Sequence, residues 1–400
     1  MNKKSIKDIA LKGKKVIIRV DFNVPLDEKQ GITDDRRIQA AIPTIKYALA
    51  QGAKKVILMS HLGRPKGKVV EEMRLFPAAQ RLESLLKENV SSLKDCVGEA
   101  IKKAIATGSP RIVLLENLRF HKEETDNDPE FAKALASLAD IYVNDAFGSA
   151  HRAHASTEGI TKYLPSVAGF LMEKELNYLG QVVSHPAKPL VVILGGAKVS
   201  DKIMLIENLL TKADSILIGG GMAYTFLKAQ GISIGQSLLE ADKIDFAKSI
   251  LAKAKAAHVQ IVISHDFVIV DDFGKPAHAK ISDKIPDGWQ GIDIGPKTRQ
   301  QFKEILSKAK TVVWNGPVGV FEVEAYSKGT QEIAEYLAGL KGVTTIVGGG
   351  DSAAAVSKFG VADKMTHIST GGGASLELLE GKQLPGVVAL NDKQEKVAVR

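Results

Sequence analysis

Residues 190–198 read Leu-Val-Val-Ile-Leu-Gly-Gly-Ala-Lys, a short apolar run that ends abruptly in two glycines and a lysine. An apolar, β-branched run of this length, bounded by glycine, is typical of a fully buried strand in a parallel sheet. Similar runs alternate with longer amphipathic stretches along the whole chain, which indicates strands joined by helical crossovers. The pattern predicts an α/β fold with parallel sheets.

The expected elements divide into two halves. The first half has strands at Val16–Val20, Val56–Met59, Ile112–Leu115 and Ile141–Val143, and helices such as Phe76–Lys87 and Pro129–Leu138. The second half has strands at Leu190–Leu194, Ser215–Ile218, Gln260–Ile263, Thr311–Trp314, Thr344–Val347 and Thr366–Ile368. The Asp- and Gly-rich stretch Phe267–Gly295 is weakly periodic, so we expect a hairpin or a long loop there.

A domain boundary is expected near the middle of the chain. At 400 residues the chain exceeds the size at which one hydrophobic core keeps growing. A helical pattern over Glu173–Val183 is followed by Pro186 and Pro189, which cannot both lie inside a regular helix. We therefore predict a first domain over 1–172, an interdomain helix and hinge over 173–187, and a second domain over 188–379.

Composition narrows the class of ligand. The formal charge of +8 suits nucleic acid, membrane surfaces or anionic metabolites. No apolar segment approaches the roughly 20 residues of a membrane helix, and the aromatic residues are not interleaved with basic clusters as base stacking requires. We expect a small anionic ligand, and neither a nucleic-acid nor a membrane partner.

The chain has a single cysteine, Cys96. It excludes an intramolecular disulfide and a cysteine-rich metal site, and it suits a reducing compartment such as the cytoplasm. We interpret Cys96 as a lone structural thiol.

In open parallel sheets, ligands bind beyond the carboxyl ends of the strands. The expected strands of the first half are followed by Asp21 and Asn23, by Ser60–Pro65, by Glu116–Arg119 and by Asn144–His154. Three of these four ends deliver an arginine, whose fork of donors matches carboxylate and phosphate oxygens. The first domain is therefore predicted to bind a small polyanion.

The strands of the second half are followed by glycine. The turns are Gly195–Lys198, Gly219–Gly221, Asn315–Pro317, Gly348–Ser352 and Gly371–Ser375. Glycine lets the backbone approach a ligand and aims the amides of a helix start at phosphate. Lys198 and Lys202 lie four residues apart at the start of the following helix and are expected to reach one phosphate chain, while Asp351 is placed to hold Mg²⁺ beside a nucleotide.

Some motifs in the sequence favour other functions. Gly348–Ala353 fits a dinucleotide fingerprint, so a dehydrogenase is the main alternative, although the next strand, about 20 residues on, ends without the carboxylate it needs. The chain contains neither a P-loop motif nor a Gly-x-Ser-x-Gly elbow. His151 and His154 are interpreted as anion contacts or packing residues and not as metal ligands. A catalytically silent binding protein is a third possibility.

Six segments in order along the chain carry a resemblance to a known family: Arg19–Pro25, Ser60–Pro65, Asn144–Ser156, Gly195–Lys202, Asn315–Glu322 and Ser369–Lys382. Together they resemble phosphoglycerate kinase. The resemblance implies reversible phosphoryl transfer from 1,3-bisphosphoglycerate to MgADP, giving 3-phosphoglycerate and MgATP in glycolysis. It also implies a monomer of two Rossmann-like lobes, joined by a helix and hinge, whose C-terminal segment 380–400 packs back on the N-terminal lobe.

The resemblance assigns residues to each ligand. The phosphoglycerate side receives Asp21, Asn23, Arg37, His61, Arg64, Arg119 and Arg152. The nucleotide side receives Lys198, Lys202, Gly295, Asn315, Glu322, Gly349, Gly350, Asp351 and Ser352. The counterpart of Glu322 binds the ribose, and that of Asp351 holds Mg²⁺. Arg36 lies directly beside Arg37, so whether Arg36 shares the role assigned to Arg37 is left open.

The expected chemistry consists of alignment and charge neutralisation, because the oxygen that reacts is a carboxylate and no base is needed. We expect Arg37 and Lys198 to contact the phosphoryl group in transfer, with the amides of Gly371, Gly372 and Gly373 stabilising the same charge. These groups lie on different domains, so the mechanism calls for hinge closure that also excludes water.

Overall fold

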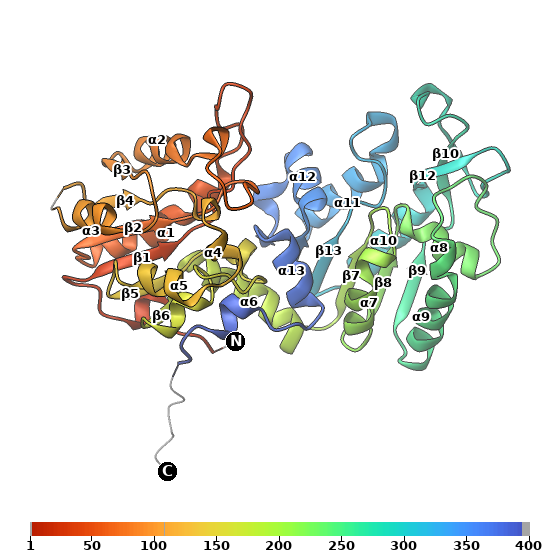
Figure 1. The fold of residues 1–400 in the computed structure, drawn as a ribbon. Helices are drawn as coiled ribbons and strands as arrows, with labels where there is room; N and C mark the ends of the chain where they lie inside the picture. Colours follow the sequence, from red (N-terminus) through yellow and green to blue (C-terminus); the bar gives the residue numbers. More distant parts are fainter. Residues whose placement is uncertain (1, 108, 394–400) are drawn as a thin grey trace, which may run out of the picture. The chain divides into compact units, whose positions relative to one another are not determined.

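The computed structural model describes residues 2–107 and 109–393. It divides the chain into two compact units, the first formed by Met1–Asn177 together with Gln383–Arg400 and the second by Tyr178–Lys382. Each unit contains a six-stranded parallel sheet flanked by helices (Figure 1). The predicted α/β class is confirmed.

The sheet of the first unit has the strand order β3-β4-β2-β1-β5-β6. Its strands are β1 (Lys15–Arg19), β2 (Lys55–Met59), β3 (Val90–Ser92), β4 (Ile112–Leu114), β5 (Ile141–Asn144) and β6 (Ser166–Ala168). The helices are α1 (Arg36–Ala50), α2 (Phe76–Leu86), α3 (Glu99–Ala106), α4 (Lys122–Thr125), α5 (Pro129–Ala136), α6 (Phe170–Ser184) and α14 (Pro385–Val388). Every residue of β2 is buried, as expected for a parallel strand covered on both faces.

The main sheet of the second unit has the order β15-β14-β13-β7-β8-β9. Its strands are β7 (Leu190–Leu194), β8 (Ser215–Ile218), β9 (Gln260–Ile263), β13 (Thr311–Asn315), β14 (Thr344–Gly348) and β15 (His367–Ile368). The helices are α7 (Ile203–Leu210), α8 (Met222–Ala229), α9 (Ile244–Ala256), α10 (Pro296–Leu306), α11 (Lys328–Gly339), α12 (Gly350–Lys358) and α13 (Gly372–Leu379).

The stretch Phe267–Gly295 is more regular than its sequence indicates. It forms an antiparallel sheet of order β11-β10-β12, made of β10 (Phe267–Val270), β11 (Lys280–Ser282) and β12 (Gln290–Ile294). Phe267 and Ile269 of β10 pack with Tyr224 of α8 in a small separate core. Packing against α8 explains why this stretch forms regular strands although its sequence is only weakly periodic.

Helix α6 contains the division between the two units. Its first turn belongs to the first unit, where the Asp145 carboxylate accepts hydrogen bonds from the backbone N–H groups of Leu171 (2.8 Å) and Met172 (3.2 Å). Burial raises the pKa of Asp145 to about 7. The buried Asp145, which directly follows β5, therefore fixes the start of α6.

The chain's last described residues pack on the first unit. The backbone N–H of Gly386 donates to the oxygen of Ala150 (2.9 Å), and its own oxygen accepts from Asn144 Nδ2 (3.0 Å). Further along, Asn391 bonds through its backbone to Lys4 and Ser166. Residues 394–400 of the predicted returning segment lie outside the described residues. In the described ranges, no helix has the length and apolar character to cross a membrane.

Candidate active site

Four neighbouring strands of the first unit end at one edge of its sheet. Strands β4, β2, β1 and β5 are adjacent and parallel, so the residues that follow them emerge on the same side. Asp21, His61, Arg119 and Arg152 all follow one of these strands. The expectation that strand ends collect the polar residues therefore holds for the first sheet.

Arg37 is placed by a carboxylate at this edge. It lies at the start of α1, and its Nη1 donates to Asp21 Oδ2 at 2.9 Å. Asn23 lies beside them, where its Oδ1 accepts from the backbone N–H of Gly63 at 2.9 Å. Arg36 points to a different partner, since its Nε donates to Asp34 Oδ2 at 2.9 Å.

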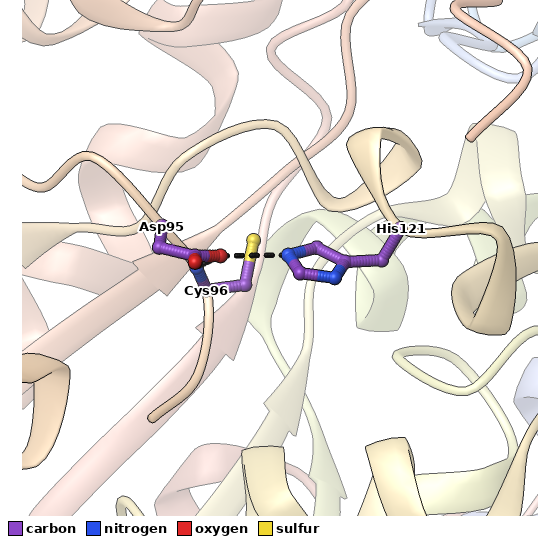
Figure 2. A group of neighbouring side chains, drawn as sticks. All are labelled: Asp95, Cys96 and His121. Atoms are coloured by element: carbon purple, nitrogen blue, oxygen red, sulfur yellow. Dashed lines mark hydrogen bonds and ion pairs between the residues drawn. The ribbon is translucent and has the colours of Figure 1, made fainter. Parts of the chain in front are cut away.

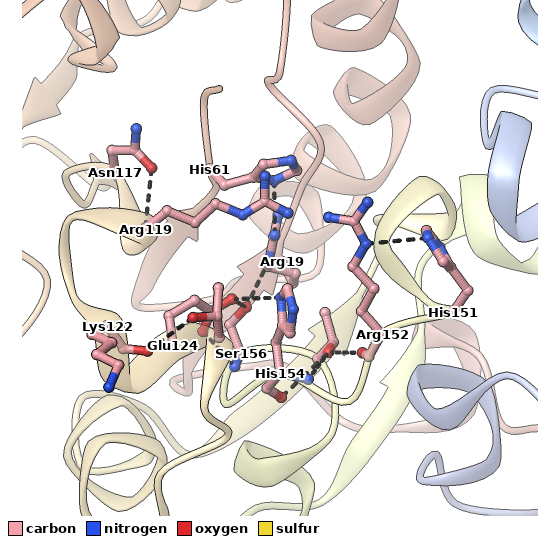
Figure 3. A network of polar contacts seen from close by, with 12 residues as sticks. Arg19, His61, Asn117, Arg119, Lys122, Glu124, His151, Arg152, His154 and Ser156 are labelled. Atoms are coloured by element: carbon pink, nitrogen blue, oxygen red, sulfur yellow. Dashed lines mark hydrogen bonds and ion pairs between the residues drawn. The ribbon is translucent and has the colours of Figure 1, made fainter. Parts of the chain in front are cut away.

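His61 is enclosed by cationic side chains. It is 5% exposed, and its Nδ1 lies 3.0 Å from an Nη of Arg19 (Figure 3). Burial, and then the charges of Arg19, Arg119, Arg37 and Arg152, hold the pKa of His61 well below 6.5. His61 is therefore neutral at physiological pH. A bound anion would offset the positive charges that keep the imidazole neutral.

Arg119 and Arg152 line a cavity of about 540 Å³. Arg119 is 6% exposed, donates to the oxygen of Gly63 (2.8 Å), and has a buried Nε for which the described residues offer no hydrogen-bond partner. Burial and the neighbouring arginines lower the pKa of Arg119 to about 10. The other lining residues are Arg64, Lys66, Gly67, Lys122, Thr125 and His154. A cavity with this lining suits a phosphate or carboxylate.

A buried carboxylate lies behind these cations. Glu124 of α4 is fully buried and accepts from the hydroxyl (2.7 Å) and backbone N–H (2.9 Å) of Ser156, with His154 Nδ1 3.7 Å away (Figure 3). Ser156 also accepts from Arg19 Nε at 2.8 Å. Although burial acts in the opposite direction, hydrogen bonds and nearby cations lower the pKa of Glu124. Glu124 thus places a carboxylate close to His154 and in contact with Arg19 through the Ser156 hydroxyl.

In the second unit, the turns after the neighbouring strands β7 and β13 bring backbones into contact. The N–H of Gly196 donates to the oxygen of Pro317 at 2.7 Å, linking the turn after β7 to the turn after β13. A side chain at Gly195 would overlap that oxygen, and Gly196 and Gly316 both have φ of +92°. These positions require glycine for close approach and for left-handed backbone.

The two lysines lie on a different local structure from the one expected. Lys198 precedes the 3₁₀ turn Ser200–Lys202, and α7 begins only at Ile203, so the two lysines are not one turn apart on an α-helix. Lys198 is exposed, whereas Lys202 is partly buried, and this burial lowers its pKa. Glu240 holds the turn in place by accepting from the backbone N–H groups of Val199 and Ser200.

A second cavity, of about 570 Å³, lies beside these turns. Among its lining residues are Glu322 and Asp351, both exposed, together with apolar side chains such as Leu238, Phe273 and Val320. The glycines Gly196, Gly220, Gly221, Gly291 and Gly319 complete much of its wall. A largely apolar cavity with a few acidic groups at its edge suits a nucleoside with its phosphates directed outward.

Asn315, Gly349, Gly350 and Ser352 lie at neighbouring strand ends. Asn315 ends β13 and is 4% exposed, and Gly349, with φ of +90°, directly precedes α12, which begins at Gly350. The hydroxyl of Ser352 is buried and accepts from the N–H of Gly316 at 2.7 Å. In this structure Ser352 therefore ties two glycine turns together.

Two further predicted positions lie at helix starts. Gly295 precedes α10, whose first amides are capped by the Asp266 carboxylate, and Gly295 is not among the described residues that line the second cavity. Gly371 precedes α13, which includes Gly372 and Gly373 in its first turn, and the N–H of Gly371 donates to Ser369 Oγ at 3.2 Å.

Sequence reasoning did not assign several supporting residues. Arg19 could have been noticed as a charge that closes an otherwise apolar strand, within a segment already quoted for the resemblance. Glu124 and Glu240 lie in polar stretches far along the chain from the groups they hold, so no sequence signal identifies them.

Comparisons with known proteins agree along almost the entire chain. A family model described as phosphoglycerate kinase matches residues 6–382. Two proteins named phosphoglycerate kinase, from Synechococcus elongatus and Gloeothece citriformis, are 60% identical (96% of each chain covered) and 58% identical (98% of this chain, 100% of the relative). Solved phosphoglycerate kinases from Coxiella burnetii and Pyrococcus horikoshii superpose with TM-scores of 0.88 and 0.79 at 41% and 34% identity, covering 97% of this chain and 98% of theirs.

Proposed function

The chain belongs to the phosphoglycerate kinase family, and from this premise we propose how its residues divide the work of the reaction. The reaction is reversible transfer of a phosphoryl group from 1,3-bisphosphoglycerate to ADP, giving 3-phosphoglycerate and ATP. The dehydrogenase and silent-protein alternatives are therefore set aside. One observation supports this assignment of roles to the two units. Arginines follow the strands of the first unit's sheet, whereas glycine turns follow the strands of the second unit's sheet.

The first unit is proposed to bind the phosphoglycerate. Arg64, Arg119 and Arg152 line its cationic cavity, and they match the charge of a ligand that carries both a phosphate and a carboxylate. Arg37 and His61 lie at the same sheet edge, with Asp21 holding Arg37. Asn23 adds an amide that fixes the Gly63 turn.

The second unit is proposed to bind ADP and ATP. Glu322 would hold the ribose at the edge of the cavity, and Lys198 and Lys202 would neutralise the phosphates. Asp351 lies in the first turn of α12 and has an exposed carboxylate, a hard oxygen ligand suited to the Mg²⁺ that accompanies the nucleotide. When bound, this ion neutralises part of the phosphate charge. Asn315, Gly349, Gly350 and Ser352 shape the adjoining turns, and Gly295 is assigned by the resemblance alone.

The transfer step needs alignment and not a base, because a carboxylate oxygen and a phosphate oxygen exchange the phosphoryl group. We assign Arg37 and Lys198 to that group, with the amides of Gly371, Gly372 and Gly373 stabilising its charge as it moves. Because Arg37 and Lys198 belong to different units, the proposal requires closure about α6 in each catalytic cycle. We further propose a monomer that acts in the cytoplasm.

The test is ³¹P NMR of the purified protein with MgATP and 3-phosphoglycerate, with a downstream trap for the acyl phosphate. We expect an ADP signal that grows only when 3-phosphoglycerate is present. ATP that stays bound without transfer would contradict the assigned reaction.

A further inference from the structure

One cluster of metal-ligating side chains lies outside the site described above. Asp95 and Cys96 follow β3, and His121 directly precedes α4, all within the first unit. One ligand atom from each residue lies within 4.8 Å of the other two (Figure 2). The sequence separates His121 from the other two residues, so the cluster exists only in the folded chain.

The three side chains already point toward a common point. His121 Nε2 lies 2.7 Å from Asp95 Oδ1, and the thiol of Cys96 donates to the backbone oxygen of Glu116 at 3.0 Å. Asp95 Oδ1 also accepts from the backbone N–H of Cys96 at 2.6 Å. A modest adjustment of these groups brings a sulfur, an imidazole nitrogen and a carboxylate oxygen onto one ion.

The electrostatic surroundings favour a cation. Cys96 is fully buried, and the Asp95 carboxylate lies in the same cluster. The carboxylate attracts a cation, and a bound metal ion would stabilise the Cys96 thiolate by direct coordination. The side chains of Asp95 and His121 are 53% and 27% exposed, so solvent can deliver the ion and supply a fourth ligand.

We propose that Asp95, Cys96 and His121 form a binding site for a borderline-soft divalent cation of the Zn²⁺ class. Binding replaces the S–H bond of Cys96 with a sulfur–metal bond, and the proton leaves to solvent. Mg²⁺ and Ca²⁺ are disfavoured because they prefer oxygen ligands throughout. The site is separate from the Mg²⁺ that accompanies the nucleotide, and it gives a role to a thiol that the sequence alone identified as structural.

An ion at this position would join two segments of the first unit. Asp95 and Cys96 lie on the connection from β3 to α3, whereas His121 lies two residues after Arg119, which lines the cationic cavity. An ion that binds the folded state alone stabilises it by mass action. We therefore expect the metal to raise the thermal stability of the protein.

The test is titration of the untagged, nucleotide-free protein with Co²⁺, a spectroscopic substitute for Zn²⁺. We expect a thiolate-to-cobalt charge-transfer band in the near ultraviolet that saturates at one ion per chain and disappears when Zn²⁺ is added. Cys96→Ser should abolish the band. His121→Asn should weaken Co²⁺ binding by at least about tenfold, because loss of a direct ligand exceeds the loss of an outer-shell partner.

A matched control comes from another histidine–aspartate pair. His278 Nδ1 lies 2.9 Å from Asp271 Oδ1 on the second unit, and the two side chains are 48% and 41% exposed. His278→Asn should leave the band and its midpoint unchanged.

Two results would overturn the site: no charge-transfer band at excess Co²⁺, or a band that persists in Cys96→Ser. Circular dichroism establishes that each variant is folded. If the buried Cys96→Ser change prevents folding, the His121→Asn variant, at a partly exposed position, decides, and an unchanged midpoint in it rejects the proposal.

Discussion

The two units differ in what their strand ends present to a ligand. In the first unit, Arg19, His61 and Arg119 are buried side chains, and Arg19 donates to Ser156, whose hydroxyl donates in turn to the carboxylate of Glu124. In the second unit, Gly195 and Gly316 bring one backbone against another, with little room for any side chain. The first site is therefore expected to be sensitive to charge and pH, and the second to steric bulk. Four experiments test that distinction.

The largest effect is expected from Arg37→Ala. Arg37 acts on the phosphoryl group during transfer, so turnover should fall by roughly 10³-fold while MgADP affinity stays nearly unchanged. Steady-state kinetics and calorimetric titration with MgADP give the two values. Arg36→Ala is the matched control, because Arg36 bonds to Asp34 instead, and it should retain turnover. If Arg37→Ala lowered MgADP affinity as much as turnover, the assignment of separate ligands to the two units would be wrong.

The next effect tests the steric sensitivity of the second unit. An added methyl at Gly195 would overlap the backbone oxygen of Pro317, so Gly195→Ala should lower the free energy of unfolding by about 3 kcal/mol. Urea denaturation measures the change. Gly339→Ala is the control, because no atom lies within 4 Å of the added methyl. Equal stability of the two variants would show that the glycine turns are not as tight as described.

A smaller effect is expected from Lys202→Ala. Removing one cation from the phosphate side should weaken MgATP binding by about tenfold and leave 3-phosphoglycerate binding unchanged. Separate calorimetric titrations with each ligand measure this, with the exposed Lys248→Ala variant as the reference. An equal loss of affinity for both ligands would contradict the assignment of Lys202 to the nucleotide site alone.

The smallest effect concerns pH and the first unit. The folded-state pKa of His61 lies well below 6.5, whereas the unfolded chain takes up this proton near 6.5. The contribution of His61 to the free energy of unfolding is therefore fully present above pH 6.5. It is lost as the pH falls from 6.5 toward the folded-state pKa, at up to about 1.4 kcal/mol per pH unit. His61→Gln should remove this slope from urea denaturation between pH 5 and 7. Identical slopes in the two proteins would contradict the buried, neutral histidine.

Sequence patterns predicted the longer strands well because their apolar runs are distinctive. The three-residue strands β3 and β6 were missed, since Val90–Ser92 and Ser166–Ala168 are short and include serine. The antiparallel sheet of β10, β11 and β12 was expected only as a hairpin or loop, because its core forms with a distant helix.

Site residues that directly follow strands could be predicted from the sequence, whereas site residues elsewhere in the chain could not. His61 and Arg119 come directly after apolar runs, so position in the chain indicates position in space. Glu124 and Glu240 act across the fold, on groups that are distant in sequence. No local sequence pattern records such contacts, because they form only in the folded chain.

The return of residues 383–393 to the first unit has a consequence for synthesis on the ribosome. Gly386 bonds to Asn144 and Ala150, on the segment that leads to Arg152, and Asn391 bonds to Lys4 near the start of the chain. These partners are synthesised on either side of the second unit, more than 200 residues apart. The second unit is a continuous stretch and can fold as soon as it has been made, whereas the first unit, although begun earlier, closes only after the whole of the second unit has been synthesised.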